Sequence, residues 1–282
     1  MTFAKMFAFL CLLLLSPTMT ESKHFNGGTI TWTPVDSYTN SSPVVITITQ
    51  TYFWVLTEVD CNVNVPISTP GRAGQGRNLI CVANCSTDGG YSANMIDTIT
   101  DCVSSNSFAN VMQSQASKNI TITSDAYFTI AYQDGGWRKV NNSAAGDWSI
   151  VSYIDLRKRP DGFINTSPVS MIQSPRYVLP NRTTHIKIPI YDANKGDVVR
   201  CRWALKTGLN GVDECDTICN ANNLPVGTNL TDCVLTFVST AQDSWYGFTL
   251  QVNYNQLRKT KHEFILRIFR LKIILMQRVN LQ

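Results

Sequence analysis

The chain has 282 residues, of which 44% are apolar and only 16% are charged, a composition that excludes wholesale disorder. Its formal net charge of +4 comes from the ends, because residues 256–282 carry seven Lys or Arg and one Glu, and Lys5 adds another positive charge. Residues 21–255 hold 16 basic and 19 acidic side chains, which excludes a broad basic surface for nucleic acid.

The N-terminus has the three parts of a secretory signal peptide. Lys5 is the basic part, residues 7–15 are an unbroken apolar run, and small polar residues follow as far as Ser22. The apolar run is too short to span a bilayer as a mature helix, and a buried N-terminal helix is the less favoured alternative. We therefore predict that residues 1–22 are a signal peptide and that the mature protein is secreted and extracellular.

Cysteine usage also favours an oxidising compartment. One of the nine cysteines, Cys11, lies in the signal peptide and leaves an even number, eight. They form two clusters with the shared pattern C-x(n)-C-x3-C-x(m)-C, namely Cys61, Cys81, Cys85 and Cys102, then Cys201, Cys215, Cys219 and Cys233. We predict two disulfides within each cluster, and the sequence does not choose among the three pairings that each cluster allows. Zinc is the competing interpretation, but C-x3-C is not the usual zinc spacing and we predict no metal.

Other features repeat in the same order around the two clusters. Residues 40–44 and 165–169 share the pattern Asn-[Ser/Thr]-Ser-Pro-Val and precede the first and second clusters. Aromatic, alternating segments follow the clusters at residues 126–132 and 245–252. Shared order and spacing indicate an internal duplication, with coincidence in a cysteine-rich chain as the alternative.

Short strands are predicted along both halves of the chain. Apolar and polar residues alternate at residues 28–33, 44–54, 120–123, 126–132, 149–154, 185–191, 198–203, 233–237 and 245–252. Gly, Asn and Asp residues predict turns between them, for example at residues 26–28 and 194–197, and only residues 92–111 suggest a short helix. This pattern predicts an all-β fold of two tandem antiparallel β-sandwich-like modules, each stapled by two disulfides.

The module boundaries follow from changes in composition. Residues 156–162 combine a charge run with a proline and a glycine, so we expect a linker there, between module 1 at residues 23–155 and module 2 at residues 163–255. Residues 256–282 differ abruptly in composition and form a basic tail of doubtful structure. A cationic interfacial helix and a non-native extension are equally weighted interpretations of this tail.

Sequons provide a further sign of secretion. The pattern N-x-[ST] occurs at Asn40, Asn84, Asn119, Asn141, Asn165, Asn181 and Asn229. Each would have to lie on an accessible surface to carry a glycan. Asn84 has a cysteine at the middle position and Asn40 is followed closely by Pro43, so these two are the poorest candidates.

No known catalytic motif occurs, and we predict neither catalytic residues nor cofactors. The mature histidines are His24, His185 and His262, and His185 lies in an alternating strand where a structural role is expected. A hydrolase with two strand-borne carboxylates is the remaining enzymatic alternative. Residues 192–197 offer three oxygen-bearing side chains around a glycine but lack the bidentate Glu of an EF-hand loop, so a polar turn is favoured over a calcium site.

Aromatic residues lie mostly in or beside the predicted strands. The set is Trp32, Tyr52, Phe53, Trp54, Trp137, Trp148, Trp203 and Trp245. We expect them to pack in the cores, whereas a carbohydrate-binding platform would need several exposed, coplanar rings.

Residues 23–32 resemble the opening His-Phe-x-Gly-Gly-Thr-Ile-x-Trp of a family of uncharacterised secreted ectodomain proteins from molluscs and other invertebrates. Residues 161–169 and 196–203 are also similar to this family, and the resemblance covers about residues 23–254. It implies a β-rich ectodomain with an adhesive or matrix role, shell matrix in some members, and it supplies no catalytic residues. After Tyr254 the chain departs from the family's pattern, which favours a truncated or alternatively spliced product.

Together these features predict a secreted extracellular structural or adhesive protein, in the setting of a matrix. The expected partners are extracellular proteins or polysaccharide, with no nucleic acid and no membrane span in this chain. A soluble recognition module, such as a lectin-like or immune-type binder or a receptor fragment, is the alternative, and a hydrolase is the third. The sequence leaves the ligand, the disulfide pairing and the oligomeric state open.

Overall fold

The structure is a computed structural model that describes residues 25–59, 77–137, 140, 146–194, 196–219, 224–225, 227–240, 244–256 and 272–279. The predicted signal peptide, Cys61, Asn141, His24 and His262 therefore lie outside the described residues. Within the described ranges the regular elements are β-strands and single-turn 3-10 helices, and none of the helices is long and apolar enough to cross a membrane. The predicted all-β class is confirmed.

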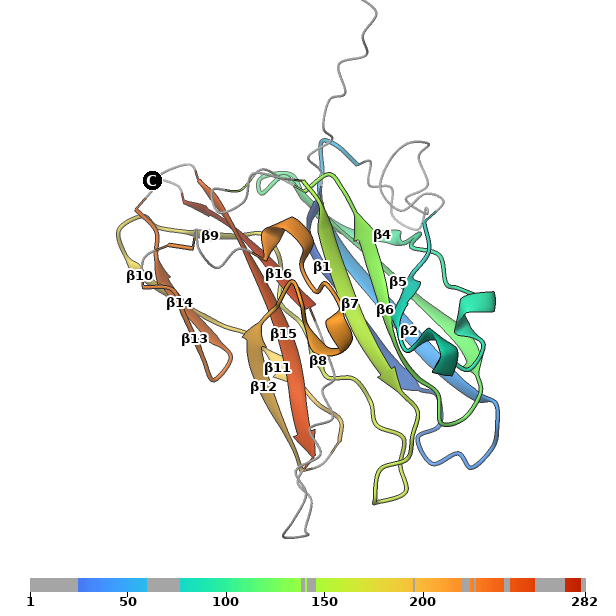
Figure 1. The fold of residues 1–282 in the computed structure, drawn as a ribbon. Helices are drawn as coiled ribbons and strands as arrows, with labels where there is room; N and C mark the ends of the chain where they lie inside the picture. Colours follow the sequence, from blue (N-terminus) through green and yellow to red (C-terminus); the bar gives the residue numbers. More distant parts are fainter. Residues whose placement is uncertain are drawn as a thin grey trace, which may run out of the picture.

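The first half folds into a two-sheet sandwich (Figure 1). One sheet has the order β1-β2-β5-β4 and consists of β1 (Phe25–Pro34), β2 (Val44–Val55), β5 (Val111–Ile122) and β4 (Asp101–Asn106). The facing sheet has the order β3-β6-β7 and consists of β3 (Ile80–Ala83), β6 (Tyr127–Asp134) and β7 (Trp148–Asp155). All these pairs are antiparallel. This is the strand order of an immunoglobulin constant-type sandwich.

The second half repeats the arrangement with one change. One sheet, β10-β14-β13, consists of β10 (Thr183–Lys187), β14 (Val234–Val238) and β13 (Asn229–Thr231). The other, β12-β15-β16-β9, consists of β12 (Asp197–Trp203), β15 (Trp245–Gln256), β16 (Lys272–Val279) and β9 (Arg176–Val178). A separate ribbon pairs β8 (Val169–Ser170) with β11 (Ile190–Tyr191). The first strand of this sandwich, β9, joins the opposite sheet by pairing parallel to the last strand, β16.

Three expectations from sequence need correction. Residues 272–279 form β16, so the second sandwich continues into the basic tail instead of ending at residue 255, and these residues are a strand and not an interfacial helix. Residues 92–111 contain only the end of the 3-10 turn η2 (Tyr91–Ala93) before β4 begins. Residues 26–28 lie inside β1 rather than in a turn, because a register shift between Phe25 and Gly27 absorbs the glycine-rich segment.

Aromatic side chains fill the core of the first sandwich. The fully buried rings include Phe25, Tyr52, Trp54, Tyr132 and Trp148. Phe25 stacks on Trp148 at 3.8 Å between ring centroids, and Tyr52 of β2 meets Tyr132 of β6 edge-on at 5.2 Å. Ring pairs of this kind join the two sheets through large buried surfaces. The expectation that the aromatics in this half pack in the core is confirmed.

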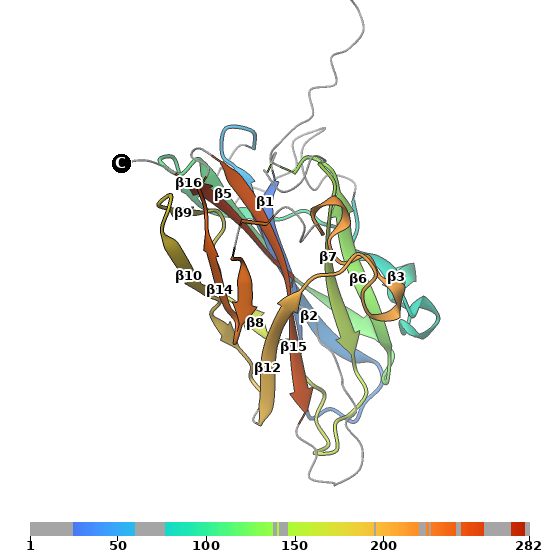
Figure 2. The same ribbon diagram turned by 60° about the vertical axis from the view of Figure 1, so that its left-hand side comes forward.

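The two sandwiches lie side by side and share buried surface (Figures 1 and 2). The edge strands β1 and β7 of the first sandwich contact β16, and β7 and β15 both contact the 3-10 turn η4 (Asp216–Ile218) of the second. Every residue of β7 is buried, because one face meets the first core while Val151 on the other face packs with Val212. The second half thus covers strand edges that would otherwise be open to pairing with other chains.

The segment expected to be a linker is anchored rather than loose. Arg159 has only 5% of its side chain exposed, and it forms an ion pair with Asp197 of β12 at 2.8 Å. Tyr38 and Phe163 meet edge-on beside it at 4.4 Å. Residues 156–162 therefore belong to the contact between the halves. Burial of Arg159 beside a carboxylate is the physical reason, since a guanidinium leaves water only when it is paired.

The inner two cysteines of each cluster are bonded to each other. In the first half, Cys81 of β3 is bonded to Cys85, which follows that strand, and in the second half Cys215 is bonded to Cys219 in the segment after β12. Cys201 of β12 is bonded to Cys233 at the turn before β14, and Cys102 is also disulfide-bonded. Each bridge between described cysteines stays inside one half, as predicted, and the inner pair of each cluster forms a five-residue loop. This shared pattern supports the duplication.

Candidate functional site

The outer face of the first sheet carries rows of small hydroxyl and amide side chains. The antiparallel register of β1 and β2 places Thr29 opposite Thr51 and Thr31 opposite Thr49. On β5 the row continues with Gln115 and Ser117, and Thr49 and Ser117 share a hydrogen bond of 2.9 Å. Period-two alternation puts these residues on one face while Ile30 and its neighbours fill the core on the other. The result is a row of neutral polar side chains that lies beside Asp101 of β4, the residue opposite Gln115.

A segment from the second half runs over this polar face and makes it concave. Residues 169–173, including β8, form one wall of a 370 Å³ hollow whose floor includes Thr29, Thr51 and Gln115. An adjoining 300 Å³ hollow lies between Thr31 and Tyr191, and Val169 lines both. We call these two hollows the junction groove, lined by Thr29, Thr31, Thr49, Thr51, Gln113, Gln115, Val169 and Tyr191.

Backbone and side-chain hydrogen bonds hold the groove wall against the first sheet. The Trp32 amide donates to the Ser167 hydroxyl at 3.2 Å, and the Ser167 amide donates to the Trp32 carbonyl at 3.1 Å. The Trp32 indole N–H in turn donates to the Tyr153 carbonyl of β7 at 2.8 Å. Because these groups are buried, the wall has a defined position relative to the floor.

The rim of the groove exposes apolar side chains. Tyr191 is 66% exposed and Met171 is 75% exposed. A further hollow of 480 Å³ adjoins the groove at Val169, and it includes the charged side chains Lys187 and Asp232. The polar side chains that line the groove itself are those of threonine, serine and glutamine, so it offers neutral hydrogen-bond donors and acceptors beside an exposed aromatic ring.

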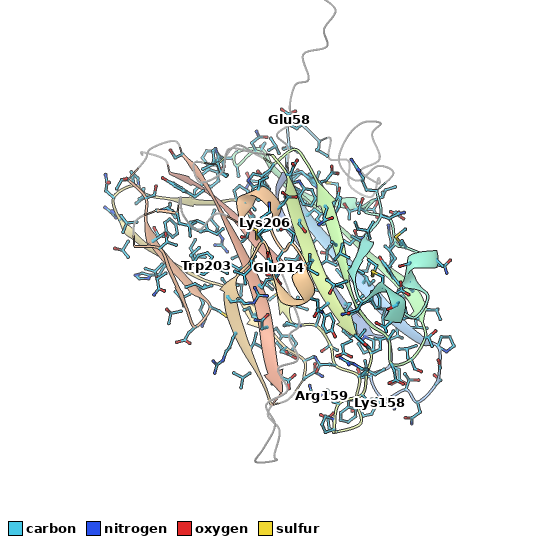
Figure 3. The ribbon with its side chains drawn as sticks, viewed as in Figure 1. Glu58, Lys158, Arg159, Trp203, Lys206 and Glu214 are labelled. Carbon is cyan, nitrogen blue, oxygen red and sulfur yellow. A yellow bond between two sulfur atoms is a disulfide. The ribbon has the colours of Figure 1, made fainter. Side chains whose placement is uncertain are left out.

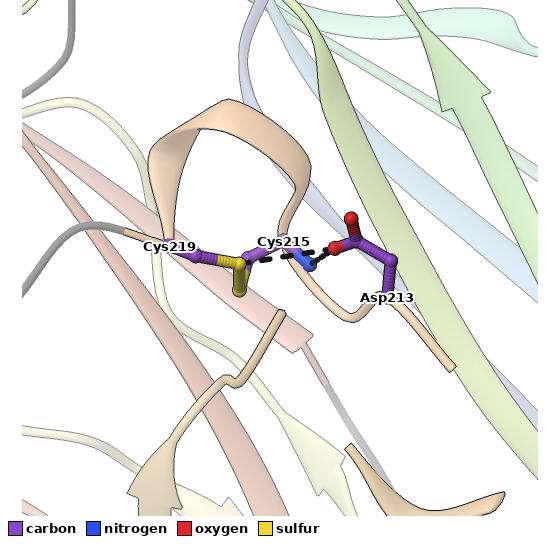
Figure 4. Close-up of side chains that lie close together, drawn as sticks. All are labelled: Asp213, Cys215 and Cys219. Carbon is purple, nitrogen blue, oxygen red and sulfur yellow. Dashed lines mark hydrogen bonds between the residues drawn. A yellow bond between two sulfur atoms is a disulfide. The ribbon is translucent and has the colours of Figure 1, made fainter. Parts of the chain in front are cut away.

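The predicted disulfide cysteines are structural and do not form part of this groove. Asp213, Cys215 and Cys219 come close together in the second half (Figure 4). The two sulfur atoms are bonded to each other, so neither is a thiolate that could bind zinc. The Asp213 carboxylate accepts hydrogen bonds from the Cys215 amide at 3.0 Å and the Asp216 amide at 2.7 Å, which holds the start of η4.

The sequons differ in their surroundings. Asn40, Asn119, Asn181 and Asn229 are exposed, and Asn84 is half-buried. Asn165 is an exception, because it is 1% exposed and its amide group accepts a hydrogen bond from Arg159 and donates one to the Thr166 carbonyl. A glycan on Asn165 would have no path to solvent in this fold. We therefore withdraw Asn165 from the predicted glycosylation sites.

His185, the one histidine within the described ranges, lies on β10 away from the groove. Its Nδ1 atom is 2.9 Å from the Thr236 hydroxyl of β14, directly across the strand pair. This cross-strand contact agrees with the structural role expected from the sequence.

Comparisons of the chain with protein-family models, with curated proteins and with solved structures found no match.

The sequence analysis did not predict the residues that line the junction groove. A signal was present, because Thr alternates in both residues 29–33 and 47–51, and period-two alternation puts each set on one face. That the two sets lie side by side depends on pairing of β1 with β2, and the covering wall comes from the other half of the chain.

Proposed function

We propose that the protein is a secreted extracellular adhesive or structural protein that binds an uncharged polysaccharide, or an extended protein segment, through the junction groove. The observation that supports this most directly is the concave row of threonine and glutamine side chains, with Tyr191 exposed at its rim. Sugar hydroxyls and peptide groups both need neutral donors and acceptors, and an exposed ring supplies apolar contact area.

The proposal of secretion has independent support. The N-terminal residues have the composition of a signal peptide, and disulfides persist in oxidising compartments. Three disulfides join described cysteines, and several sequons lie on exposed residues. These features, with the resemblance to invertebrate secreted ectodomains, support an extracellular matrix or adhesive role.

The first test measures binding of the secreted chain to insoluble polysaccharides and to extracellular matrix extract by co-sedimentation. Tyr191→Ala should weaken binding about tenfold, because exposed aromatic anchors typically contribute about 1–2 kcal/mol or more at an interface. Tyr38→Ala is the matched control, since Tyr38 is similarly exposed at 70% but does not line the groove. Equal binding by the wild type and by Tyr191→Ala would contradict the proposal that the junction groove is the binding site.

A soluble recognition module is the second candidate, and the bounded shape of the groove favours it. Such a protein would select one ligand rather than bind a bulk matrix. A glycan array with the same chain separates the two candidates. One strongly preferred soluble glycan would support recognition, whereas retention in the insoluble fraction without a preferred glycan would support the adhesive role.

A further inference from the structure

Strand β5 has one side that is paired over only part of its length. On one side, β2 pairs with β5 from Val111 to Ile122, the whole strand. On the other side, β4 pairs with β5 only as far as Gln115. Within the part of the chain that the structure describes, no strand pairs with residues 116–122 on that side. We call residues 116–122 the open edge of β5.

Pairing with β4 stops at Gln115 because the chain that leads into β4 comes from the facing sheet. Asp97 forms an antiparallel bridge with Asn78, beside β3, and the Thr98 amide donates to the Arg77 carbonyl at 3.1 Å. The backbone of this segment therefore pairs with the other sheet and not with β5. The Lys118 side chain reaches across and forms an ion pair with Asp97.

An open edge favours association with other chains. Every second residue of an edge strand directs its N–H and C=O groups away from the paired neighbour, toward any further strand that approaches. Residues 116–122 read Ala-Ser-Lys-Asn-Ile-Thr-Ile, without proline or glycine, and the charge of Lys118 is neutralised by Asp97. Uncovered segments of this composition promote pairing between molecules.

Asn119 is the central residue of the open edge and begins the sequon Asn-Ile-Thr. It is exposed and lies opposite Thr47 of β2. The Thr47 hydroxyl donates to Asn119 Oδ1 at 2.8 Å, so Oδ1 faces β2. The Nδ2 atom, which is the attachment point of an N-glycan, projects from the same carbon in a different direction and stays available.

The other described sequons provide a comparison. Besides Asn119, only Asn229 among them lies within a strand, β13, which is the last strand in the order β10-β14-β13. The remaining described sequons lie between strands, at Asn40, Asn84, Asn165 and Asn181. Because β13 has only 3 residues, its edge offers little backbone for pairing. Asn119 is thus the sequon with the most open backbone beside it.

We propose that Asn119 carries an N-linked glycan and that this glycan covers the open edge of β5, which prevents edge-to-edge pairing with a second copy of the chain. A partner strand has to come within about 4.8 Å of β5, a space that a bulky, hydrated glycan on the central residue of the edge would occupy. The inference rests on the proposed secretion, because N-glycans are added in the secretory pathway, and is independent of the ligand of the junction groove.

The test compares the wild-type chain with Thr121→Ala, both secreted from a eukaryotic host. Thr121→Ala removes the sequon and leaves Asn119 and its hydrogen bond from Thr47 in place. Glycopeptide analysis should find a glycan on Asn119 in the wild type. By analytical ultracentrifugation, the dissociation constant of self-association should be about tenfold or more lower for Thr121→Ala, a change of about 1.4 kcal/mol. In the associated variant, the amides of residues 116–122 should gain protection from hydrogen exchange.

Further variants separate the glycan from the substitution. Asn119→Gln removes the sequon at its other end and should associate like Thr121→Ala, whereas Thr121→Ser keeps the sequon and should behave like the wild type. Thr121→Lys removes the sequon but adds a charge at the edge, so it should stay monomeric without a glycan. Thr183→Ala is the matched control, because it removes the exposed sequon at Asn181, which lies in a turn.

Two results would overturn the proposal and leave the proposed function standing. One is an unoccupied Asn119 in a secreted chain that carries glycans at other sequons. The other is equal self-association of the wild type, Thr121→Ala and Asn119→Gln. A chain that carries no glycan at any sequon would contradict both this proposal and the proposed secretion.

Discussion

At the scale of single residues, Glu214 carries a buried carboxylate in the loop before η4. None of its side chain is exposed, and Arg202 binds it through two nitrogen atoms at 2.7 and 2.8 Å, while the Leu205 amide donates to the same carboxylate at 3.0 Å (Figure 3). A Cβ atom at Gly208 would collide with this carboxylate, which explains the glycine there. The pair ties β12 to the loop that covers β7.

Replacing Glu214 with alanine should leave the Arg202 guanidinium without its partner. We expect Glu214→Ala to lower the free energy of unfolding by about 3–5 kcal/mol, measured in urea, as for other broken buried pairs. Lys206→Ala is the control, because Lys206 is 65% exposed and lies 3.8 Å from Asp213. That change should cost less than about 1 kcal/mol. Similar costs for the two variants would show that the Glu214 pair does not stabilise the fold.

Asp88 gives a prediction of pH dependence. Burial by itself would raise its pKa, but hydrogen bonds from the Ser92 hydroxyl and from the Gly90 and Ser92 amides outweigh burial and lower the pKa. Because the pKa of Asp88 is lower in the folded state, its ionised carboxylate adds to the free energy of unfolding at pH values above the unfolded-state pKa of about 3.9. This contribution is lost as the pH falls through the lower folded-state pKa.

Asp88→Asn should therefore destabilise the protein by about 1–2 kcal/mol at neutral pH, because a hydrogen-bonded charge is lost. The cost should shrink toward zero by about pH 2, where the wild-type carboxyl is also neutral. Urea unfolding of both proteins at the two pH values measures the difference. A cost that is the same at both pH values would mean that the charge of Asp88 is not what stabilises η2.

At the scale of elements, the two disulfides of the second half close loops of different size. Cys201 and Cys233 are 32 residues apart, whereas Cys215 and Cys219 are 4 apart. A longer loop removes more conformational freedom from the unfolded chain. The longer bridge also joins β12 of one sheet to the turn before β14 of the other, so it should matter more to the sandwich.

The double variant Cys201→Ala/Cys233→Ala should lose about 4 kcal/mol of unfolding free energy, and Cys215→Ala/Cys219→Ala about 2 kcal/mol. Denaturant unfolding of both variants under non-reducing conditions provides the comparison. A larger loss of unfolding free energy from removing the short-loop disulfide would indicate that the packing of this loop against β7 and β15, rather than chain entropy, controls its contribution.

Peptide mapping of the wild-type chain under non-reducing conditions identifies the partner of Cys102. Cys61 is the remaining cysteine of the predicted mature chain.

At the scale of the whole molecule, the halves share one hydrophobic cluster. The cluster that holds Phe25 and Trp137 of the first half also contains Ala204 and Ile218 of the second. Gly247 of β15 lies directly against Ile218 and Trp137, and a Cβ atom there would collide with Ile218. Such contact predicts that the two halves unfold as one cooperative unit, unlike domains joined by a flexible linker.

We expect one transition in calorimetric unfolding of the mature chain. Ile218→Ala should move that single transition to lower temperature, with a loss of about 2–5 kcal/mol typical of a buried large-to-small change. Phe237→Ala in the core of the second half is the comparison, and it should move the same transition. Two separate transitions, with only one shifted by either change, would show that the halves unfold independently.

Much of the architecture could be predicted from local patterns in the sequence. Alternation at residues such as 44–54 and 149–154 places strands because the period of two is a property of the strand itself. The repeated cysteine spacing predicted bridges within each half, and the described pairs agree. Burial of Trp32, Trp54 and Trp148 also followed from their position in strands.

Other features depended on which distant segments come together. Residues 272–279 carry a pattern that fits a helix poorly, and only pairing with β15 and β9 makes them a strand. Asn165 has the sequence of a sequon, yet it is buried against Arg159, whose side chain also pairs with Asp197 in the contact between the halves. The burial of Asn165 depends on packing between the two halves, and the residues next to it in the sequence do not predict it.

The sequence by itself determined the β class, the duplicated cysteine pattern and the signal-like N-terminus, because each rests on short-range periodicity or composition. The tertiary structure decided that β1 and β7 are covered, that Thr29 and Thr51 lie opposite each other beneath residues 169–173, and that Arg159 and Asp197 form a buried ion pair. The physical reason is that strand pairing and packing between the halves join residues far apart in the chain, and no local pattern specifies those partners.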